Sequence, residues 1–438
     1  MASPAGRLTR ALQHRNFRLF FGGQSISLVG TWITRVATSW LVYRLTGSEL
    51  LLGVAGFAGQ IPTLIITPFA GVLVDRHDRR RILLWTQAGS LLQSALLAVL
   101  TFTDVITVRQ IIWLQVVQGI INSFDTPARQ AFVSEMVEDR RDLPNAIALN
   151  SSMVNGTRII GPSIGGVLIA AFGEGWCFAI DAISYVAVIA SILAMRVRPR
   201  VHQEAAEMHL LQELHHGWKY VFHSVPIRSA LLLVAIISTA GTPYTVLMPA
   251  IAAQVLHGGP NTLGLLMTAT GVGALTGALY LAQRESVLGL GRIIPTAAAL
   301  FGAGLITFSF TPVLWLALPC LVLTGFGFMV QMASSNTVIQ TIVEDEKRGR
   351  VMSFYMMAFL GTAPFGSLMA GWLSERIGAP RTLTVGGLCC IVGALWFARA
   401  LPTIRAAVRP IYVRLGILPE MAAGLNTAAE ASVPPERG

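Results

Sequence analysis

A stretch of 51 consecutive residues without a charged side chain, Ile293 to Val343, constrains this chain more than any other feature. An apolar run longer than about 18 residues predicts a membrane-spanning helix, because about 20 helical residues cross the hydrocarbon of a bilayer. Charged residues make up 12% of the 438 residues, whereas soluble domains carry roughly 25%. The sequence therefore predicts a membrane-embedded protein and excludes a soluble enzyme, a disordered chain and a coiled coil.

Similar apolar runs recur along the whole chain, and we predict an all-α membrane protein with twelve transmembrane helices. Only helices satisfy the backbone within one segment of this length in lipid, because β-barrel strands are about 10 residues long and alternate in polarity. The predicted ranges are 19–43, 50–74, 82–103, 108–127, 143–171, 175–195, 229–256, 261–283, 292–311, 313–341, 350–374 and 380–399.

The basic residues lie in short loops between the apolar runs, so the net charge of +10 does not indicate a nucleic-acid partner. With both termini in the cytoplasm, 26 of the 32 lysines and arginines fall on the inner side and four in outer loops. This positive-inside bias predicts a multi-pass protein of the cell (cytoplasmic) membrane with both termini cytoplasmic. The remaining two basic residues, Arg35 and Arg158, fall inside predicted helices.

The chain also contains signs of an internal duplication. Val137-Glu-Asp follows the fourth predicted helix and Val343-Glu-Asp follows the tenth, while Pro162 and Pro364 lie in glycine-rich parts of the next helix. Two six-helix halves with a site between them form one large class of transporters. The predicted organisation is a cytoplasmic N-terminus (1–18), an N-terminal half (19–195), a cytoplasmic linker (196–228) with an amphipathic helix, a C-terminal half (229–400) and a partly disordered cytoplasmic tail (401–438).

The loop between the second and third predicted helices carries a dense set of charges. A small residue permits close helix contact, an acid can cap a helix, and clustered arginines bind carboxylates or phosphates. A plain positive-inside loop is the alternative interpretation of the charges alone. The spacing resembles the signature loop of the major facilitator superfamily, Gly-x-Leu-x-Asp-Arg-x-Gly-Arg-Arg. Here it reads Gly71-Val-Leu-Val-Asp75-Arg76-His-Asp78-Arg79-Arg80-Arg81, with Asp78 in place of the second glycine.

This resemblance implies the major facilitator fold, in which the loop joins a charge network that latches the outward-facing state. In that family the network includes an acid at the inner end of helix four and the start of helix eleven. A static structural pairing of these charges is the alternative. The matching residues here are Gly71, Asp75, Arg76, Arg79 and Asp125, facing Arg348 and Arg350.

The fifth predicted helix carries a second motif, Gly161-Pro162-Ser-Ile-Gly165-Gly166. Its glycines form a small-residue face, and its proline bends the helix. Ordinary helix packing is the plain alternative. The run resembles the family's antiporter motif, Gly-x-x-x-Gly-Pro-x-x-Gly-Gly, with Thr157 at the first glycine. With segments 40–48, 124–132 and 349–371, it resembles the enterobactin-exporter-like and drug-efflux branch.

Three ionisable residues inside predicted helices are candidates for substrate binding or coupling, because each costs a few kcal/mol in the membrane. Arg35 lies roughly 13 Å and Asp181 roughly 10 Å from the outer ends of their helices, so the two can pair. A substrate that competes for Arg35 would then change the protonation of Asp181, which is a way to build proton exchange. A structural ion pair at Asp181 is equally compatible. Arg158 lies near the middle of the fifth helix. Two arginines and one acid suit an anionic or polar substrate better than a cation.

We therefore expect a monomeric secondary active transporter that exports a small amphipathic molecule, a siderophore or a drug, by alternating access. Proton antiport is the expected coupling, although Gln115 replaces an arginine that many proton-coupled exporters of the superfamily carry. The expected partners are the substrate, membrane lipids and H⁺, with no nucleic acid, enzyme activity, cofactor or metal. The alternatives are a lipid or lysophospholipid flippase and a non-transporting membrane scaffold or sensor.

Overall fold

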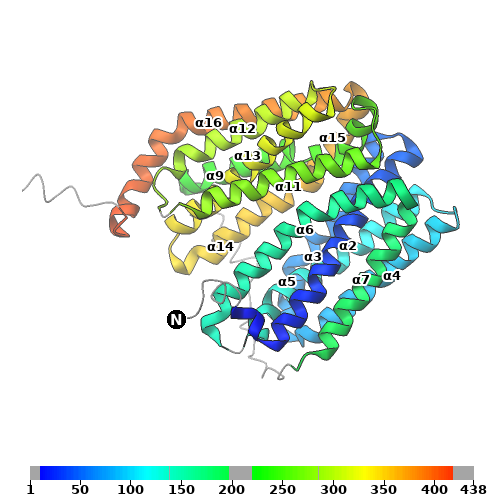
Figure 1. The fold of residues 1–438 in the computed structure, drawn as a ribbon. Helices are drawn as coiled ribbons and strands as arrows, with labels where there is room; N and C mark the ends of the chain where they lie inside the picture. The colour runs from blue at the N-terminus through cyan, green and yellow to red at the C-terminus, as the bar shows by residue number, and fades with distance from the viewer. Residues whose placement is uncertain (1–9, 138, 197–219, 285, 418–438) are drawn as a thin grey trace, which may run out of the picture.

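The computed structural model describes residues 10–137, 139–196, 220–284 and 286–417, and these residues are nearly all helical (Figure 1). The helices pack in two groups. The first group contains α2 (Arg15–Thr46), α3 (Glu49–Arg76), α4 (Arg79–Phe102), α5 (Val108–Met136), α6 (Leu143–Phe172) and α7 (Glu174–Ala194). The second group contains α9 (Val225–Ile236), α10 (Tyr244–Ala250), α11 (Pro260–Ala282), α12 (Leu290–Ser309), α13 (Leu314–Ile342), α14 (Asp345–Met356), α15 (Ala363–Ile377) and α16 (Ala379–Arg414).

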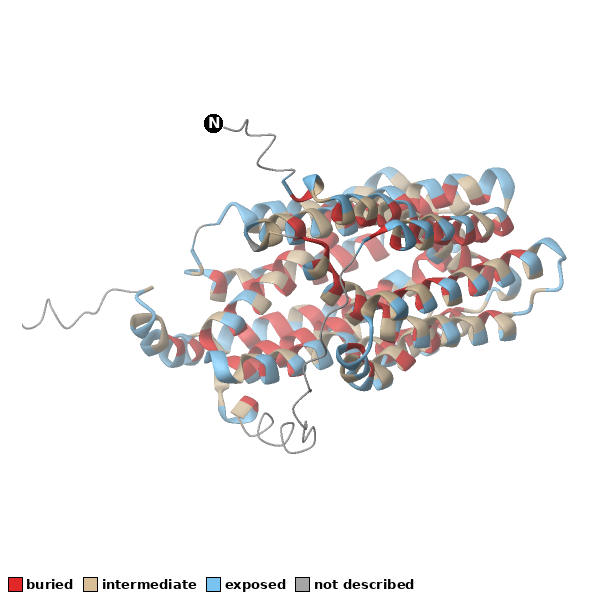
Figure 2. Cartoon of the chain, turned by 90° about the horizontal axis from the view of Figure 1, so that it is seen from below, coloured by how far each residue is buried: buried red, intermediate tan, exposed pale blue. Residues whose placement is uncertain are grey.

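Nine helical segments among the described residues are long and apolar enough to cross a membrane. Three further helices, α2, α5 and α6, are 32, 29 and 30 residues long and pack beside them. Large apolar side chains such as Trp85, Trp113 and Trp315 are 79%, 66% and 77% exposed. Figure 2 shows buried residues on the faces between helices and exposed ones around the outside. This pattern is stable when lipid rather than water surrounds the helices.

Helix contacts define how the two groups meet. Within the first group α2 packs on α6 and α7, α4 on α5 and α7, and α3 on α5. Within the second, α13 packs on α11 and α12, and α12 packs on α16. The largest contacts between the groups join α6 to α11 and α3 to α15 (Figure 1). Smaller contacts from α10 to α2 and α3 complete the shared interface.

Successive long helices reverse direction, so their loops collect at two ends of the bundle. We call the end with the α3–α4 loop the Arg79 end, and the end with the α2–α3 loop the Glu49 end. At the Glu49 end Arg44 closes α2 and binds the first residue of α7, Glu174, at 2.8 Å. Short turns fix these reversals. Gly47 ends α2 in the left-handed region, at φ 61°, where a side chain is disfavoured.

Two helices continue further than the sequence predicted. The range 108–127 was too short, because α5 passes through Pro127 and ends at Met136. The range 380–399 was also too short, because α16 passes through Pro402 and continues to Arg414, inside the predicted tail. A proline removes one backbone donor, and neighbouring groups in a packed bundle compensate for it, so it need not end a helix. The predicted amphipathic linker helix lies mostly outside the described residues.

Two predicted helices, 229–256 and 350–374, are interrupted. Five-residue π-helical turns, Ile237–Gly241 and Met357–Gly361, precede α10 and α15, and another, Ile251–Val255, follows α10. Pro243 and Pro364 lie shortly after the first two turns. Each lacks the N–H that would bond the carbonyl four residues earlier, so the local change in helical pitch has a covalent cause.

Candidate functional site

At the Arg79 end, the signature loop places one arginine between two acids. Arg79 donates from Nη2 to Asp75 Oδ1 at 2.9 Å and from Nη1 to Glu135 Oε1 at 2.8 Å. Arg79 and Glu135 are mostly buried, whereas the Asp75 side chain is 63% exposed. The pair with Glu135 ties the start of α4 to the last turn of α5. Glu135 was not predicted as a site residue, because the fourth predicted helix ended at residue 127.

The same loop owes its shape to Asp78, the departure from the family pattern. The Asp78 carboxylate accepts hydrogen bonds from the backbone N–H groups of Arg80 (2.9 Å) and Arg81 (3.4 Å) at the start of α4. Its φ is −63°, so this position does not require glycine. Arg80 donates to the carbonyl oxygens of Ile192 and Leu193 at the end of α7, at 3.2 and 3.0 Å. The Asp78 carboxylate thus caps the N-terminus of α4 at a position where the family pattern has glycine.

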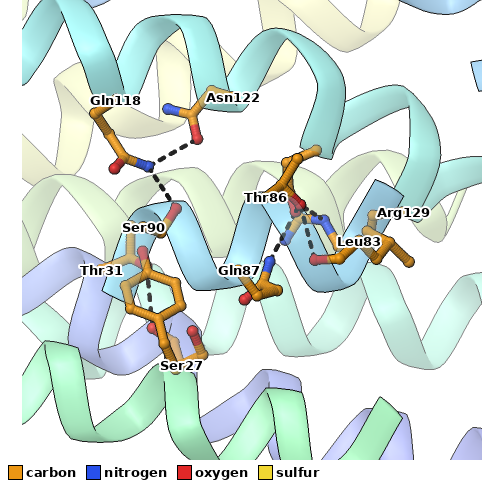
Figure 3. Close-up of polar contacts among 11 residues, drawn as sticks. Ser27, Thr31, Leu83, Thr86, Gln87, Ser90, Gln118, Asn122 and Arg129 are labelled. Carbon is orange, nitrogen blue, oxygen red and sulfur yellow. Dashed lines mark hydrogen bonds and ion pairs between the residues drawn. The ribbon is translucent and has the colours of Figure 1, made fainter. Parts of the chain in front are cut away.

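Asp125 belongs to a separate cluster in this conformation, and the single network with Asp75 and Arg79 stays a prediction for the outward-facing state. Asp125 Oδ1 accepts hydrogen bonds from Thr86 Oγ1 at 3.0 Å and Gln87 Nε2 at 2.7 Å, and its Oδ2 lies 3.6 Å from Arg129 Nε (Figure 3).

Helix register explains this separation. Because α4 and α5 run antiparallel, Arg79 lies level with Glu135, whereas Asp125 is ten residues, or about 15 Å, further into the bundle. Two turns into α4, Thr86 is the residue that faces Asp125.

Three further residues of the predicted network, Gly71, Arg76 and Arg348, have different surroundings in this conformation. A Cβ placed on Gly71 would meet no atom within 4 Å, so the expected close helix contact is absent there. Arg76 is exposed. In the second group, Arg348 pairs with Asp345 of its own helix at 2.5 Å. Arg79 and Arg348 are therefore each bound to acids of their own group.

The first residue of each repeated Val-Glu-Asp segment has a similar backbone conformation in the two groups. Val137 ends α5 and Val343 ends α13, both in extended conformation. In the first loop, hydrogen bonds from the backbone and side chain of Arg141 lower the pKa of Asp139. In the second loop, the hydrogen bond from the Lys347 ammonium at 2.6 Å lowers the pKa of Glu344. Both carboxylates are thereby held in the charged form.

The glycines of the helix-five motif face two different helices. A Cβ on Gly161 would collide with the side chain of Trp32 in α2, and one on Gly165 would lie 3.2 Å from the Cα of Ile33. Gly166 faces the other group, where a Cβ would lie 3.1 Å from the Cα of Gly264 in α11. The motif therefore brings α6 into backbone contact with both groups at once.

A matching contact joins α3 to α15 at the same end. A Cβ on Gly53 would lie 2.9 Å from the Cα of Gly371. Next to it, the buried carboxylate of Glu49 accepts a hydrogen bond from Ser374 of α15. The Glu375 carboxylate accepts hydrogen bonds from the hydroxyl of Ser48 and the backbone N–H of Leu50, each at 3.1 Å.

These bonds and the two glycine contacts join the groups toward the Glu49 end. Sequence analysis did not select Glu49 or Glu375, because only docking of the two groups reveals their partners.

Two arginines and one tryptophan meet midway along α2 and α6. The guanidinium carbons of Arg35 and Arg158 lie 4.6 and 6.0 Å from the centroid of the Trp32 ring. Arg35 is exposed and Arg158 is half-buried, so both retain accessible surface although they lie in the middle of their helices. A Cβ on Gly271 of α11 would lie 3.2 Å from the carbonyl oxygen of Arg158, and α10 contacts α2. This arginine pair therefore faces the interface between the groups.

Asp181 does not join this arrangement, so the predicted pairing with Arg35 is wrong for this conformation. The Asp181 carboxylate is buried and accepts hydrogen bonds from Ser94 of α4 at 2.8 Å and Ser184 of α7 at 3.5 Å. A Cβ on Gly30 of α2 would lie 2.7 Å from its Oδ1. Asp181 of α7 faces Gly30 of α2 and Ser94 of α4, whereas Arg35 lies over the Trp32 ring near Arg158 of α6.

Membrane-spanning helices, a paired-helix interface and buried ionic groups at that interface define a membrane transporter of the major facilitator type. The chain belongs to the family described as transmembrane secretion effector, whose model matches residues 9–413. It is similar to the staphyloferrin A transporter of Staphylococcus aureus, at 26% identity over 87% of this chain and 95% of that protein. It is also similar to the enterobactin exporter EntS of Citrobacter koseri, at 24% identity over 91% and 94%.

The fold itself matches a solved structure. A bacterial homologue of the human lysosomal transporter Spinster superposes with a TM-score of 0.69 at 12% identity, over 93% of this chain and 99% of that chain. The predicted superfamily, its branch and an all-α membrane fold are therefore confirmed. Family membership also supports the expectation that the protein is a transporter and not an enzyme.

Proposed function

We propose that this protein is a twelve-helix exporter of a small amphipathic molecule, a siderophore or a drug, and that it works by alternating access. The observation that carries the proposal is the one-sided contact between the two helix groups. Paired glycines, at Gly53–Gly371 and Gly166–Gly264, bring backbones together near the Glu49 end. In this interpretation the groups are the two six-helix halves, and they rock about the helices between them.

The distribution of basic residues indicates which end of the bundle faces the cytoplasm. The bias of lysine and arginine places the Arg79 end in the cytoplasm, together with both termini. The closed Glu49 end then faces outward, and the conformation is inward-facing. Arg79 and Arg348, each bound within its own group, correspond to a released latch. In the outward-facing state we expect Asp75 and Arg79 to engage the start of α14.

The names of the relatives support export of siderophore-like or drug-like cargo. One relative is named an enterobactin exporter, and its alignment covers most of both chains. Proton antiport is the coupling we propose, because no phosphate-binding loop for ATP hydrolysis occurs in the sequence. Glu49 is a better candidate proton carrier than Asp181. It bridges the two groups, so rocking exposes it to the outer side.

Uptake by inside-out vesicles under an imposed pH gradient tests the proposal. The panel holds a catechol siderophore, an anionic dye and a cationic dye, so that the preferred charge class emerges. We expect uptake of at least one compound that stops when a protonophore is added. Uptake of none would contradict the exporter proposal. Redistribution of labelled lysophospholipid between leaflets would then favour a flippase, and no redistribution would favour a scaffold or sensor.

A crosslink separates alternating access from a fixed channel. In a cysteine-free background, Ser48→Cys with Glu375→Cys places one thiol in each group, where the native side chains are 3.1 Å apart. A short bis-methanethiosulfonate linker should then stop uptake, and reduction should restore it. The matched control is Arg44→Cys with Glu174→Cys, whose native atoms are 2.8 Å apart within one group. The linker should leave uptake of this control intact.

A further inference from the structure

We propose that Arg35 and Arg158 jointly bind an anionic oxygen group of the substrate, so that the cargo is a small organic anion with a planar or apolar body. This inference rests on the proposed export function and narrows its substrate class. The two arginines come from different helices, α2 and α6, and their guanidinium carbons lie 4.6 and 6.0 Å from the centroid of the Trp32 ring. They lie where the first group meets α10 of the second.

The first support is the missing counter-ion. Within the described ranges, neither Arg35 nor Arg158 forms an ion pair or hydrogen bond with a protein side chain. Two arginines nearer the ends of the first group do have acidic partners. Arg44 makes two hydrogen bonds to Glu174, at 2.8 and 3.3 Å, and Arg79 contacts two acids. The central arginines thus differ from Arg44 and Arg79.

The second support is electrostatic. Arg35 and Arg158 are close enough for their charges to repel each other. An ionised side chain in the middle of a membrane costs a few kcal/mol, and a like charge nearby raises that cost. A bound anion offsets both costs, because an arginine fork binds carboxylate or phosphate oxygens through paired hydrogen bonds. The two positive charges are therefore best neutralised by an anion of the substrate, because no acidic side chain of the protein pairs with them within the described ranges.

The buried acids Asp181 and Glu49 of the first group do not neutralise the positive charges of these arginines. Asp181 is held by Ser94 and Ser184 on another side of α2. Glu49 is held at the end of the bundle by Ser374. A cationic substrate would therefore meet two positive charges without a facing carboxylate, and its binding is disfavoured.

An aromatic ring beside the arginines is available to bind the uncharged part of the substrate. Trp32 holds the guanidinium of Arg35 over its ring, which orients that group without neutralising it. Across the interface, Tyr244 and Phe301 are buried in the core of the second group. The half-buried Trp32 is therefore the ring that a planar or apolar body can reach, while the arginines fix the position of its charged end.

Two dyes with the same xanthene ring system but opposite charge test the inference. Carboxyfluorescein is anionic and rhodamine 6G is cationic, and binding of each to the full chain in nanodiscs is followed by fluorescence polarisation. We expect wild-type protein to bind carboxyfluorescein more tightly, with an affinity that falls as salt rises. Arg35→Gln and Arg158→Gln should each weaken this binding by about tenfold or more, the range for one hydrogen bond to a charged group.

The control is Arg109→Gln, an exposed arginine at the start of α5, which should leave the affinity unchanged. If either glutamine variant fails to fold, Arg35→Lys and Arg158→Lys keep the charge but lose the planar fork, and a weakened affinity for carboxyfluorescein is expected. Tighter binding of rhodamine 6G, no binding of either dye, or equal affinity in folded arginine variants would overturn the inference.

The dye experiment and the vesicle experiment fail separately. If vesicles export only a cation and carboxyfluorescein does not bind, the exporter proposal stands and the anion site is refuted. If carboxyfluorescein binding depends on both arginines but vesicles transport nothing from the panel, the anion site stands and the export proposal is refuted.

Discussion

Single residues in this protein solve local problems that the family pattern leaves open. Asp78 occupies a position where the superfamily pattern has glycine, and it caps α4 by accepting two backbone N–H groups. Arg80, next to it, satisfies carbonyls at the end of α7. One short loop therefore stabilises the ends of two helices. The same loop carries Arg79, the residue expected to change partners during transport.

The cap at Asp78 gives a graded stability prediction. Replacing a capping acid by alanine costs about 0.5–2 kcal/mol, whereas glycine costs only a few tenths. Asp78→Ala should therefore lower the thermal unfolding midpoint in detergent, and Asp78→Gly should stay close to wild type. Circular dichroism at 222 nm follows the transition. Equal losses in the two variants would mean that the carboxylate does not cap α4.

Asp181 tests whether a buried membrane acid has a structural role. Its partners are Ser94, Ser184 and the close backbone at Gly30, all within the first group. We expect Ser94→Ala to destabilise the protein by about 1–3 kcal/mol, because the carboxylate loses a donor in a buried place. Asp181→Asn should leave the dependence of uptake on the pH gradient unchanged in vesicles. If Asp181→Asn uncoupled uptake from the gradient, Asp181 would be a proton carrier.

At the scale of elements, the sequence predicts the existence and order of the helices better than it predicts their ends and their contacts. Hydropathy located the membrane helices, because lipid imposes a minimum length and an apolar surface. It placed the end of the fourth helix at 127, whereas α5 continues to Met136 and so presents Glu135 to Arg79. The partners of Glu49 are 325 residues away in sequence, and no local pattern encodes such a contact.

The glycine motif of α6 was identified from spacing, and the structure assigns each glycine a neighbour. Gly166 touches Gly264 across the interface, whereas a Cβ on Gly156, ten residues earlier in the same helix, would meet no atom within 4 Å. A methyl group at Gly166 would push α6 from α11, and overpacking of this kind costs about 1–3 kcal/mol.

We therefore expect Gly166→Ala to reduce vesicle uptake by at least about fivefold, the effect of 1 kcal/mol on a two-state equilibrium. The matched control is Gly156→Ala, which adds the same methyl group to the same helix in open space. This control should transport normally. Loss of uptake in both variants would indicate a general intolerance of α6 to substitution and would remove the Gly166–Gly264 contact from the explanation.

At the scale of the whole molecule, the proposed alternating access implies two closures of the two groups. Closure at the Glu49 end uses close backbones, Ser374 bound to Glu49, and Glu375 bound to Ser48. Closure at the Arg79 end requires Arg79 and Arg348 to exchange partners that lie within their own groups in this state. The two sets of bonds compete, because rocking that makes one set must break the other.

Weakening the Glu49 closure should therefore move the population toward the opposite state. Glu49→Gln with Glu375→Gln replaces two carboxylates that accept hydrogen bonds across the interface. At about 1 kcal/mol for each of the two carboxylates, the ratio of the two states should shift roughly 30-fold toward opening at the Glu49 end. The control is Glu174→Gln, which removes a carboxylate at the same end but within one group.

Double electron–electron resonance measures this shift with one label pair at each end. Exposed Val105 and Phe310 report on the Glu49 end, and exposed His77 and Ser286 report on the Arg79 end. In the double variant, the first distance should lengthen and the second should shorten together, since rigid groups move both ends at once. A longer distance at the Glu49 end without a change at the Arg79 end would mean local fraying, and the two-closure account would then be wrong. Glu174→Gln should reproduce the wild-type distances at both ends.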